Sequence, residues 1–167
     1  YKIGDTVLFT SVSPYRIRIS GRTKHYINAF GEELVVENAE RAIATASEKT
    51  GALINNFTAA PKYFSQDEKA AHEWVVEFEK EPDNLEDFTR FLDETLREIN
   101  SDYDAKRYRD MALTSPIVHK AEVGTFYKWM KGRGKLGGQN KVPRLSNTRE
   151  YLDDILKMLG SNHKQVL

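Results

Sequence analysis

The sequence predicts a single α+β domain: helices packed on a mixed or antiparallel sheet, preceded by a small N-terminal β-hairpin. The length of 167 residues is that of one domain. An apolar content of 40% with 30% charged residues is typical of a folded globular chain rather than a disordered one. Beyond residue 34 the order is strand, helix, strand, strand, helix, strand, helix, a split β-α-β pattern that favours helices on one face of the sheet.

The first part of the chain is predicted to form short extended segments separated by turns. Side chains from Arg16 to Ser20 alternate between polar and apolar, as in a half-buried strand. Gly21 then breaks the pattern, and the basic turn Arg22-Thr23-Lys24-His25 follows. The extended segments are predicted at residues 3–10, 15–20, 26–30 and 34–36.

The longer elements are predicted from hydrophobic spacing and from their end signals. Gly51 is expected to end the first helix, and Asn84 precedes the second, which carries acids in its first turn. Asn147 and Glu150 form a capping-box pair for the last helix, which Gly160 is expected to stop. The helices are predicted at residues 37–49, 85–99, 104–111, 124–131 and 147–159, and the strands at residues 52–60, 71–79 and 117–122.

The strand at residues 71–79 alternates between two faces. One face carries Trp74, Val76 and Phe78, and the other carries Glu73, Val75, Glu77 and Glu79. The histidines at positions 25, 72, 119 and 163 are scattered without metal-ligand spacing, and His72 and His119 are expected to be core or surface residues of strands.

Charge and composition exclude several classes of function. The net charge is zero, so no global field draws the chain to nucleic acid or to a membrane. The absence of cysteine excludes disulfides, thiolate metal sites and a cysteine nucleophile, and is compatible with a reducing compartment. No membrane-length apolar run or signal-peptide pattern is present. Because the chain starts at Tyr1 within a motif, we expect it to be a piece of a longer protein.

Residues 123–149 are the most basic stretch, with seven Lys or Arg and no acid. Glycines between the lysines favour a mobile anion-binding loop, although an ordinary solvated loop explains the composition equally well. The spacing is not that of a Walker loop. Phe126, Tyr127 and Trp129 suggest base stacking, but their helical spacing favours core packing. The glycines are Gly132, Gly134, Gly137 and Gly138.

Several motifs together resemble the adenylate-forming superfamily of acyl-CoA synthetases, adenylation domains and luciferases. They are the Gly4-Asp5 pair, the Gly21-Arg22 hinge with Lys24, and the later Gly31 and Glu40. The opening at residues 1–5 and the stretch Gln139-Asn140-Lys141-Val142-Pro143-Arg144 are most similar to the auxin-responsive (Gretchen Hagen) acyl-acid amido synthetases, in particular the bacterial ones.

The resemblance covers most of the chain but only the C-terminal domain of such enzymes. It implies that residues 1–20 end a strand pair leading from a large N-terminal domain, that residues 21–160 form the mobile lid domain, and that residues 161–167 are a tail. It further implies a cytoplasmic ligase that uses ATP and Mg²⁺, bound mainly outside this fragment. The partners implied are the enzyme's own N-terminal domain, a carboxylic acid and an amino acid, with neither nucleic acid nor membrane, and the isolated domain is expected to be inactive.

The resemblance also implies roles for individual residues. Lys141 is the expected catalytic lysine, with Lys135 as the alternative if the loop is registered differently. Asp5 is expected to hydrogen-bond the ribose hydroxyls and Arg22 to lie by the ribose and phosphate; without the resemblance both are ordinary turn residues. The remaining expected positions are Gly21 and Lys24 at the hinge, Gly31 on the acceptor side, and Gly137 and Gly138 in the lysine loop.

Two other functions remain open from the sequence. Acyl-CoA synthetases often carry Lys and Arg where this chain has Asn28 and Glu33, so an amido synthetase is favoured over a CoA-using enzyme. A non-enzymatic module that binds RNA or another anion through residues 123–149 is the alternative from a different class. Its affinity would fall steeply with salt and would not depend on Asp5.

Overall fold

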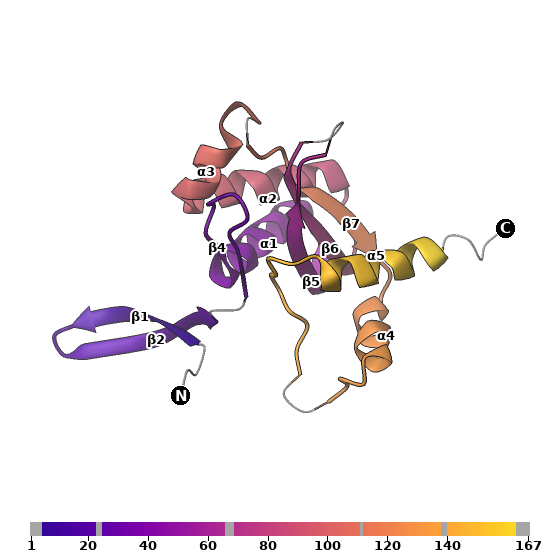
Figure 1. Cartoon of the computed structure of the whole chain (residues 1–167), viewed down its shortest axis with the longest axis horizontal. Helices are drawn as coiled ribbons and strands as arrows, with labels where there is room; N and C mark the ends of the chain where they lie inside the picture. The colour runs from indigo at the N-terminus through magenta and orange to yellow at the C-terminus, as the bar shows by residue number, and fades with distance from the viewer. Residues whose placement is uncertain (1–4, 23–24, 66–68, 111, 138–139, 163–167) are drawn as a thin grey trace.

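The computed structural model describes residues 5–22, 25–65, 69–110, 112–137 and 140–162. Its centre is a three-stranded sheet in the order β5-β6-β7 (Figure 1). Strand β5 (Leu53–Lys62) pairs antiparallel with β6 (Ala71–Lys80), and β7 (Ile117–Ala121) pairs parallel with β6. The predicted α+β class with a mixed sheet is therefore confirmed.

One face of the sheet packs against α1 (Val36–Thr50) and α2 (Leu85–Ile99). Residues Phe88, Leu92 and Leu96 of α2, which lie at helical spacing, are completely buried. Burial of each such side chain contributes roughly 1.5–3 kcal/mol. The other residues of this core include Ala39, Ala42, Ile43 and Ala46 of α1 and Trp74, Val76 and Phe78 of β6.

The opposite face packs against α4 (Thr125–Gly132) and α5 (Glu150–Asn162), so the prediction of helices on one face is wrong. The acids at Glu73 and Glu77 made this face of β6 look solvent-exposed, but both side chains are buried and partnered. Glu77 Oε2 accepts a 2.9 Å hydrogen bond from the backbone N–H of Phe126 in the first turn of α4. Phe126 and Trp129 are buried in this second core, which confirms core packing for these two rings. The expectation is wrong for Tyr127, whose side chain is exposed.

The ends of the two long helices follow their local signals. Helix α1 ends at Gly51, which adopts a left-handed conformation with φ of 65°. The side chain of Asn84 accepts hydrogen bonds from the backbone N–H groups of Glu86 and Asp87, which caps α2 as predicted. After α2, the shorter α3 (Ser101–Arg107) and a 3₁₀ turn, η1 (Tyr108–Asp110), lead toward β7.

The predicted limits of the last helix are wrong at both ends. Helix α5 begins at Glu150, because the Asn147 side chain is used elsewhere: its Oδ1 accepts a 2.7 Å hydrogen bond from the backbone N–H of Asn28. Gly160 lies inside the helix instead of stopping it. A helical glycine costs about 1 kcal/mol, which the burial of Leu152 and Ile155 offsets.

Two very short strands frame the segment at residues 28–33. β3 (Tyr26–Ile27) and β4 (Leu34–Val35) pair antiparallel, with Ile27 opposite Leu34. Both of these side chains are completely buried in the core shared with α1 and α2. The loop between them is therefore fixed at both ends to the body of the domain.

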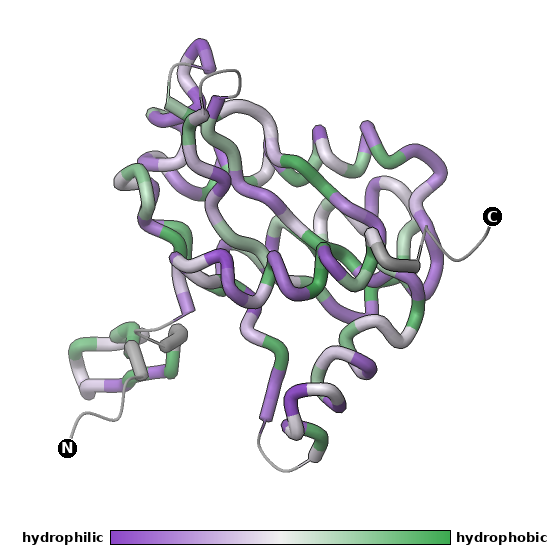
Figure 2. Tube along the Cα trace, turned by 45° about the vertical axis from the view of Figure 1, so that its right-hand side comes forward, coloured by the Kyte–Doolittle hydropathy of each residue, from purple (hydrophilic) through white to green (hydrophobic). Residues whose placement is uncertain are grey.

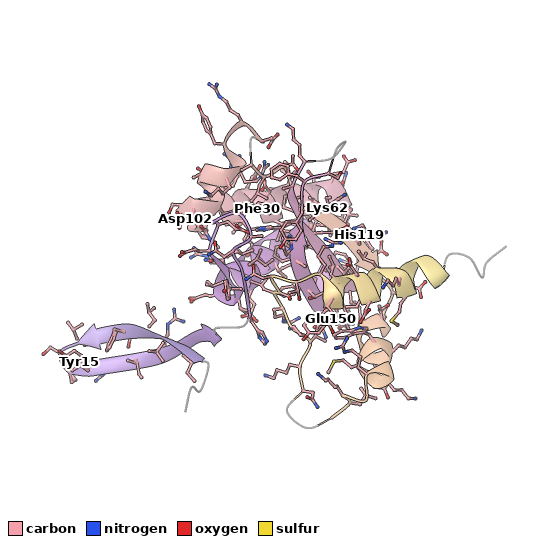
Figure 3. All side chains as sticks on the ribbon, viewed as in Figure 1. Tyr15, Phe30, Lys62, Asp102, His119 and Glu150 are labelled. Atoms are coloured by element: carbon pink, nitrogen blue, oxygen red, sulfur yellow. The ribbon has the colours of Figure 1, made fainter. Side chains whose placement is uncertain are left out.

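The N-terminal hairpin of β1 (Asp5–Val12) and β2 (Tyr15–Arg22) projects from the body (Figure 1). Tyr15 lies at the far end of the hairpin (Figure 3). Figure 2 shows that the hairpin carries hydrophobic residues. The half-buried strand predicted here is wrong for this structure: Ile17 is 59% and Ile19 69% exposed. The reason is that the two strands pair only with each other, and no described layer covers either face.

Candidate functional site

The expected nucleotide-binding residues lie at the base of the hairpin. Asp5 and Arg22 are paired positions in the register of β1 and β2, and Gly21 is paired with Thr6 beside it. The hairpin thus brings together two residues that the sequence analysis selected separately. Lys24, the expected hinge residue, lies outside the described residues, as does Gly138 of the lysine loop.

The loop at residues 28–33, which carries Gly31, is held by a buried carboxylate. The Glu32 side chain is completely buried. Its Oε2 accepts a 2.7 Å hydrogen bond from the backbone N–H of Phe30, and its Oε1 accepts one of 3.2 Å from that of Ala29. Oε1 also lies 2.8 Å from Nε2 of His72 on β6, whose side chain is completely buried too.

A second buried residue, at the cap between α2 and α3, fixes the same loop. The Asn100 side-chain amide donates a 2.9 Å hydrogen bond to the backbone carbonyl of Glu32. Gly31 itself is exposed and has φ of +84°, a backbone conformation that favours glycine. A β-carbon built on Gly31 would lie 3.4 Å from Lys106 Nζ, an ordinary contact with the end of a flexible side chain, so the positive φ is what favours glycine here. The hydrogen bonds of Glu32 and Asn100 therefore give the loop one defined backbone conformation.

The pKa of Glu32 reflects these surroundings. Burial alone would raise it, but the hydrogen bond and the charge interaction with His72, together with backbone N–H groups, hold the pKa of Glu32 below its usual value. Glu32 is therefore an ionised carboxylate that can only accept hydrogen bonds, and the hydrogen of His72 lies on Nε2. No other hydrogen-bond partner among the described residues reaches Nδ1 of His72.

The lysine loop, residues 133–143, follows α4 and is anchored at both ends. At its start, the backbone N–H of Lys135 donates a 3.0 Å hydrogen bond to the carbonyl of Met130. At its end, the carbonyl of Pro143 accepts a 2.7 Å hydrogen bond from Thr58 Oγ1 on β5. Ala59 then extends the anchor: its N–H donates to the Arg144 carbonyl at 2.9 Å, and its carbonyl accepts from the Ser146 N–H at 3.1 Å.

Between these anchors the chain presents lysines to solvent. Lys135 and Lys141 are exposed, and Gly137 has φ of +83°. Within the described part of the chain, no side-chain partner is found for any of the four lysines of the basic stretch at residues 123–149. The expected lysine, Lys141, stands two residues before the anchored Pro143, so it extends from a fixed base. The four lysines are Lys128, Lys131, Lys135 and Lys141.

The arginines of the same stretch have a different role. Arg144 lies 2.6 Å from Asn56 Oδ1 and stacks 4.5 Å from the centre of the Phe57 ring. Arg149 contacts Glu73 Oε2 at 2.7 Å, and Arg133 contacts Glu150 and Asp154 of α5 at 3.0 Å each. The basic stretch therefore divides into structural arginines and exposed lysines.

The two loops lie on connected parts of the fold. The 2.7 Å hydrogen bond from the Asn28 N–H to Asn147 Oδ1 joins the Gly31 loop to the chain that follows the lysine loop. Tyr63 OH donates a 3.2 Å hydrogen bond to the Asn147 carbonyl and packs against the Phe30 ring. No contact among the described residues joins Lys135 or Lys141 to the hairpin that carries Asp5.

Sequence reasoning missed Glu32 and Asn100 and gave His72 no role beyond the core or the surface. Their separation in the chain explains this: Glu32 lies 40 residues from His72 and 68 from Asn100, so no local spacing marks them. The one local signal was an acid directly after the glycine of a short loop. That signal does not distinguish a buried carboxylate from an exposed one.

No group of three or more acidic or histidine side chains in the described residues is placed to hold a metal ion. Among the same residues, no helix has the length and apolar character needed to cross a membrane.

Comparisons with known proteins place this geometry in a family. The model of the GH3 family C-terminal domain matches residues 37–150. Two solved structures share the fold: "GH3.15 acyl acid amido synthetase", 18% identical with a TM-score of 0.73, and "AtGH3.15 acyl acid amido synthetase in complex with 2,4-DB", 17% identical with a TM-score of 0.71. The matches cover 95% and 94% of this chain but only 30% of each solved chain. A search of curated protein sequences gave no match. The chain belongs to the GH3 family and corresponds to its C-terminal domain.

Proposed function

We propose that this chain is the mobile C-terminal domain of an ATP-dependent acyl-acid amido synthetase of the cytoplasm. In the first half-reaction a carboxylate oxygen attacks the α-phosphorus of ATP, which gives an acyl-adenylate and releases pyrophosphate. In the second, the amine of an amino acid attacks the acyl carbon, and an amide forms as AMP leaves and the amine loses a proton. Family membership supports this proposal.

The observation that carries the chemical part of the proposal is the anchored loop of Lys141. When the carboxylate attacks, negative charge concentrates on the oxygens around the α-phosphorus. An ammonium held near these oxygens lowers the barrier, and it does so best when its position is fixed in advance. The exposed side chain of Lys141, two residues from the anchor between Pro143 and Thr58, supports this role.

Asp5 and Arg22 supply the nucleotide contacts in this proposal. A carboxylate accepts hydrogen bonds from two neighbouring ribose hydroxyls, and a guanidinium pairs with phosphate oxygens. Their pairing across the hairpin supports a shared site. Mg²⁺ neutralises the ATP phosphates and is bound mainly by residues outside this chain. Rotation of this domain about Gly21 and Lys24, between the two half-reactions, would then replace Lys141 by the Gly31 loop at the reacting groups.

The test is acid-dependent exchange of pyrophosphate into ATP, measured with the intact parent protein over a panel of aryl and alkyl carboxylic acids. Exchange followed by AMP release on addition of an amino acid would support the amido synthetase. AMP release with coenzyme A instead of an amino acid would favour an acyl-CoA-type synthetase. Absence of exchange from the folded protein with every acid tested would count against adenylation and favour an anion-binding module.

A further inference from the structure

The feature that the proposed chemistry leaves unexplained is the buried, hydrogen-bonded pair of Glu32 and His72 beneath the Gly31 loop. Glu32 and His72 are both completely buried, and no other pair of charged or titratable side chains among the described residues is buried so fully on both sides. Burying an ionised carboxylate costs several kcal/mol, and buried pairs of this kind seldom add net stability. Their best-attested benefit is a single defined conformation.

What the pair defines is the backbone of the loop. The two Glu32 oxygens accept hydrogen bonds from the N–H groups of Ala29 and Phe30, so they fix two peptide units that precede Gly31. Asn100 fixes the carbonyl of Glu32, the residue that follows Gly31. Buried groups thus hold the chain on both sides of Gly31, while Gly31 itself is exposed and has a positive φ.

The lysine loop has its own anchors, which are Thr58, Ala59 and Lys135. Apart from the Asn28–Asn147 hydrogen bond and the contacts of Tyr63, the two loops are positioned by separate sets of contacts. This separation matters for an enzyme with two half-reactions, because a change under one loop need not disturb the other.

We infer that Glu32, held by His72 and Asn100, is a positioning residue for the amide-forming half-reaction and is not required for adenylation. The inference rests on the proposed function, in which the Gly31 loop serves the acceptor side. Glu32 acts through the backbone of Phe30 and Gly31 and does not itself contact the substrates.

Glu32→Gln is the sharpest variant because it preserves size and removes one acceptor. Each Glu32 oxygen accepts from an N–H group: Oε2 from Phe30, and Oε1 from Ala29 and His72. The amide group of glutamine would face a donor in either orientation, so at least one backbone N–H loses its partner. Since small misplacements of reacting groups cost on the order of 100-fold, the amide-forming rate should fall at least ten-fold.

His72 gives an independent pair of variants. His72→Leu removes the N–H that faces Glu32 and should lower amide formation as Glu32→Gln does. His72→Gln can place an N–H in a similar position and should recover part of the rate. The matched control is His119→Leu, which breaks another His–Glu contact, that of His119 Nε2 with Glu73 at 2.7 Å, on the other face of the sheet.

The experiment measures both half-reactions of the intact parent protein carrying each change. Adenylation is measured by ATP–pyrophosphate exchange, and amide formation by single-turnover consumption of the preformed acyl-adenylate with an amino acid. The expected result is exchange within three-fold of wild type with amide formation at least ten-fold slower, for Glu32→Gln and His72→Leu but not for His119→Leu. A merely structural role would instead lower both rates together, and that result, or an unchanged amide-forming rate, would overturn the inference.

If the Glu32→Gln and His72→Leu proteins do not fold, Gly31→Ala provides the test of the inference. Alanine is strained at φ of +84° and its β-carbon would approach Lys106, but no buried group is changed. A folded Gly31→Ala protein should show the same selective loss, and unchanged amide formation would overturn the inference. A wild-type parent without any exchange would count against the proposed function instead, which keeps the two failures distinct.

Discussion

The hydroxyl of Thr58 donates a 2.7 Å hydrogen bond to the carbonyl oxygen of Pro143, 85 residues away in the chain. Thr58 is buried, with 1% exposure. Thr58→Val keeps the shape of the side chain and leaves the carbonyl without this donor, so this chain should lose about 1–3 kcal/mol of unfolding free energy in urea denaturation. The control is Thr89→Val, whose hydroxyl bonds the Leu85 carbonyl within α2 and should cost less than about 1 kcal/mol. Equal losses would show that the anchor adds nothing particular.

Lys141→Ala should slow adenylation in the intact parent. Loss of one preorganised electrostatic donor costs on the order of 100- to 1000-fold, to be measured as ATP–pyrophosphate exchange. Lys131→Ala, an exposed lysine of α4, is the control and should leave exchange nearly unchanged. If Lys135→Ala shows the large loss and Lys141→Ala does not, the loop is registered in the alternative way. Exchange within a few-fold for both would withdraw the catalytic lysine.

Asp5→Asn should weaken nucleotide binding. Hydrogen bonds to charged groups contribute about 1.5–3 kcal/mol, so AMP affinity of the parent should fall about 10- to 100-fold in calorimetric titration. Arg22→Ala should act in the same direction, since it is the paired position in the hairpin. Arg16→Ala, on an exposed position of the same strand, is the control. Unchanged AMP affinity in both Asp5→Asn and Arg22→Ala would remove the hairpin from the nucleotide site.

Acid should weaken the domain through Glu73. His119 first, and then Arg149, lower the pKa of Glu73 to about 2 from 4.5, against the effect of burial. A carboxyl with a depressed folded-state pKa contributes stability above pH 4.5, and that contribution is lost as the pH falls from 4.5 toward 2. The full contribution is about 3 kcal/mol.

The measurement is urea denaturation of wild type and Glu73→Gln at pH 6 and at pH 3. The two proteins should differ most at pH 6, and the difference should narrow by about 2 kcal/mol at pH 3. Glu37→Gln, which removes an exposed pair with Arg18, should cost less than about 1 kcal/mol at either pH. A constant difference between wild type and Glu73→Gln would contradict the assignment.

The sequence predicted the parts of the fold that local signals govern. Asn84 at the start of α2 and Gly51 at the end of α1 act within a few residues, so both were predicted correctly. Asn147 failed as a helix cap because its side chain bonds Asn28, 119 residues away. The second helical face was missed because buried Glu73 and Glu77 have the same sequence pattern as exposed acids.

The candidate site divides in the same way. Motif positions placed Lys141 on an exposed loop, but its role and those of Asp5 and Arg22 stay predictions. The anchors, Thr58 for one loop and the pair of Glu32 and His72 for the other, come from distant strands. No periodicity or spacing relates such residues, and only the folded arrangement reveals them.

The bridge between Ala59 and Leu145 has a consequence for the order in which the domain is made. Strand β5 finds its partner β6 early in synthesis, but its other edge waits for residues 143–146. Until then that edge offers unpaired N–H and C=O groups, the arrangement from which strand-to-strand aggregation begins. The contacts that cover this edge are also those that anchor the lysine loop. When residues 143–146 reach β5, the same contacts would therefore cover its exposed edge and anchor the lysine loop.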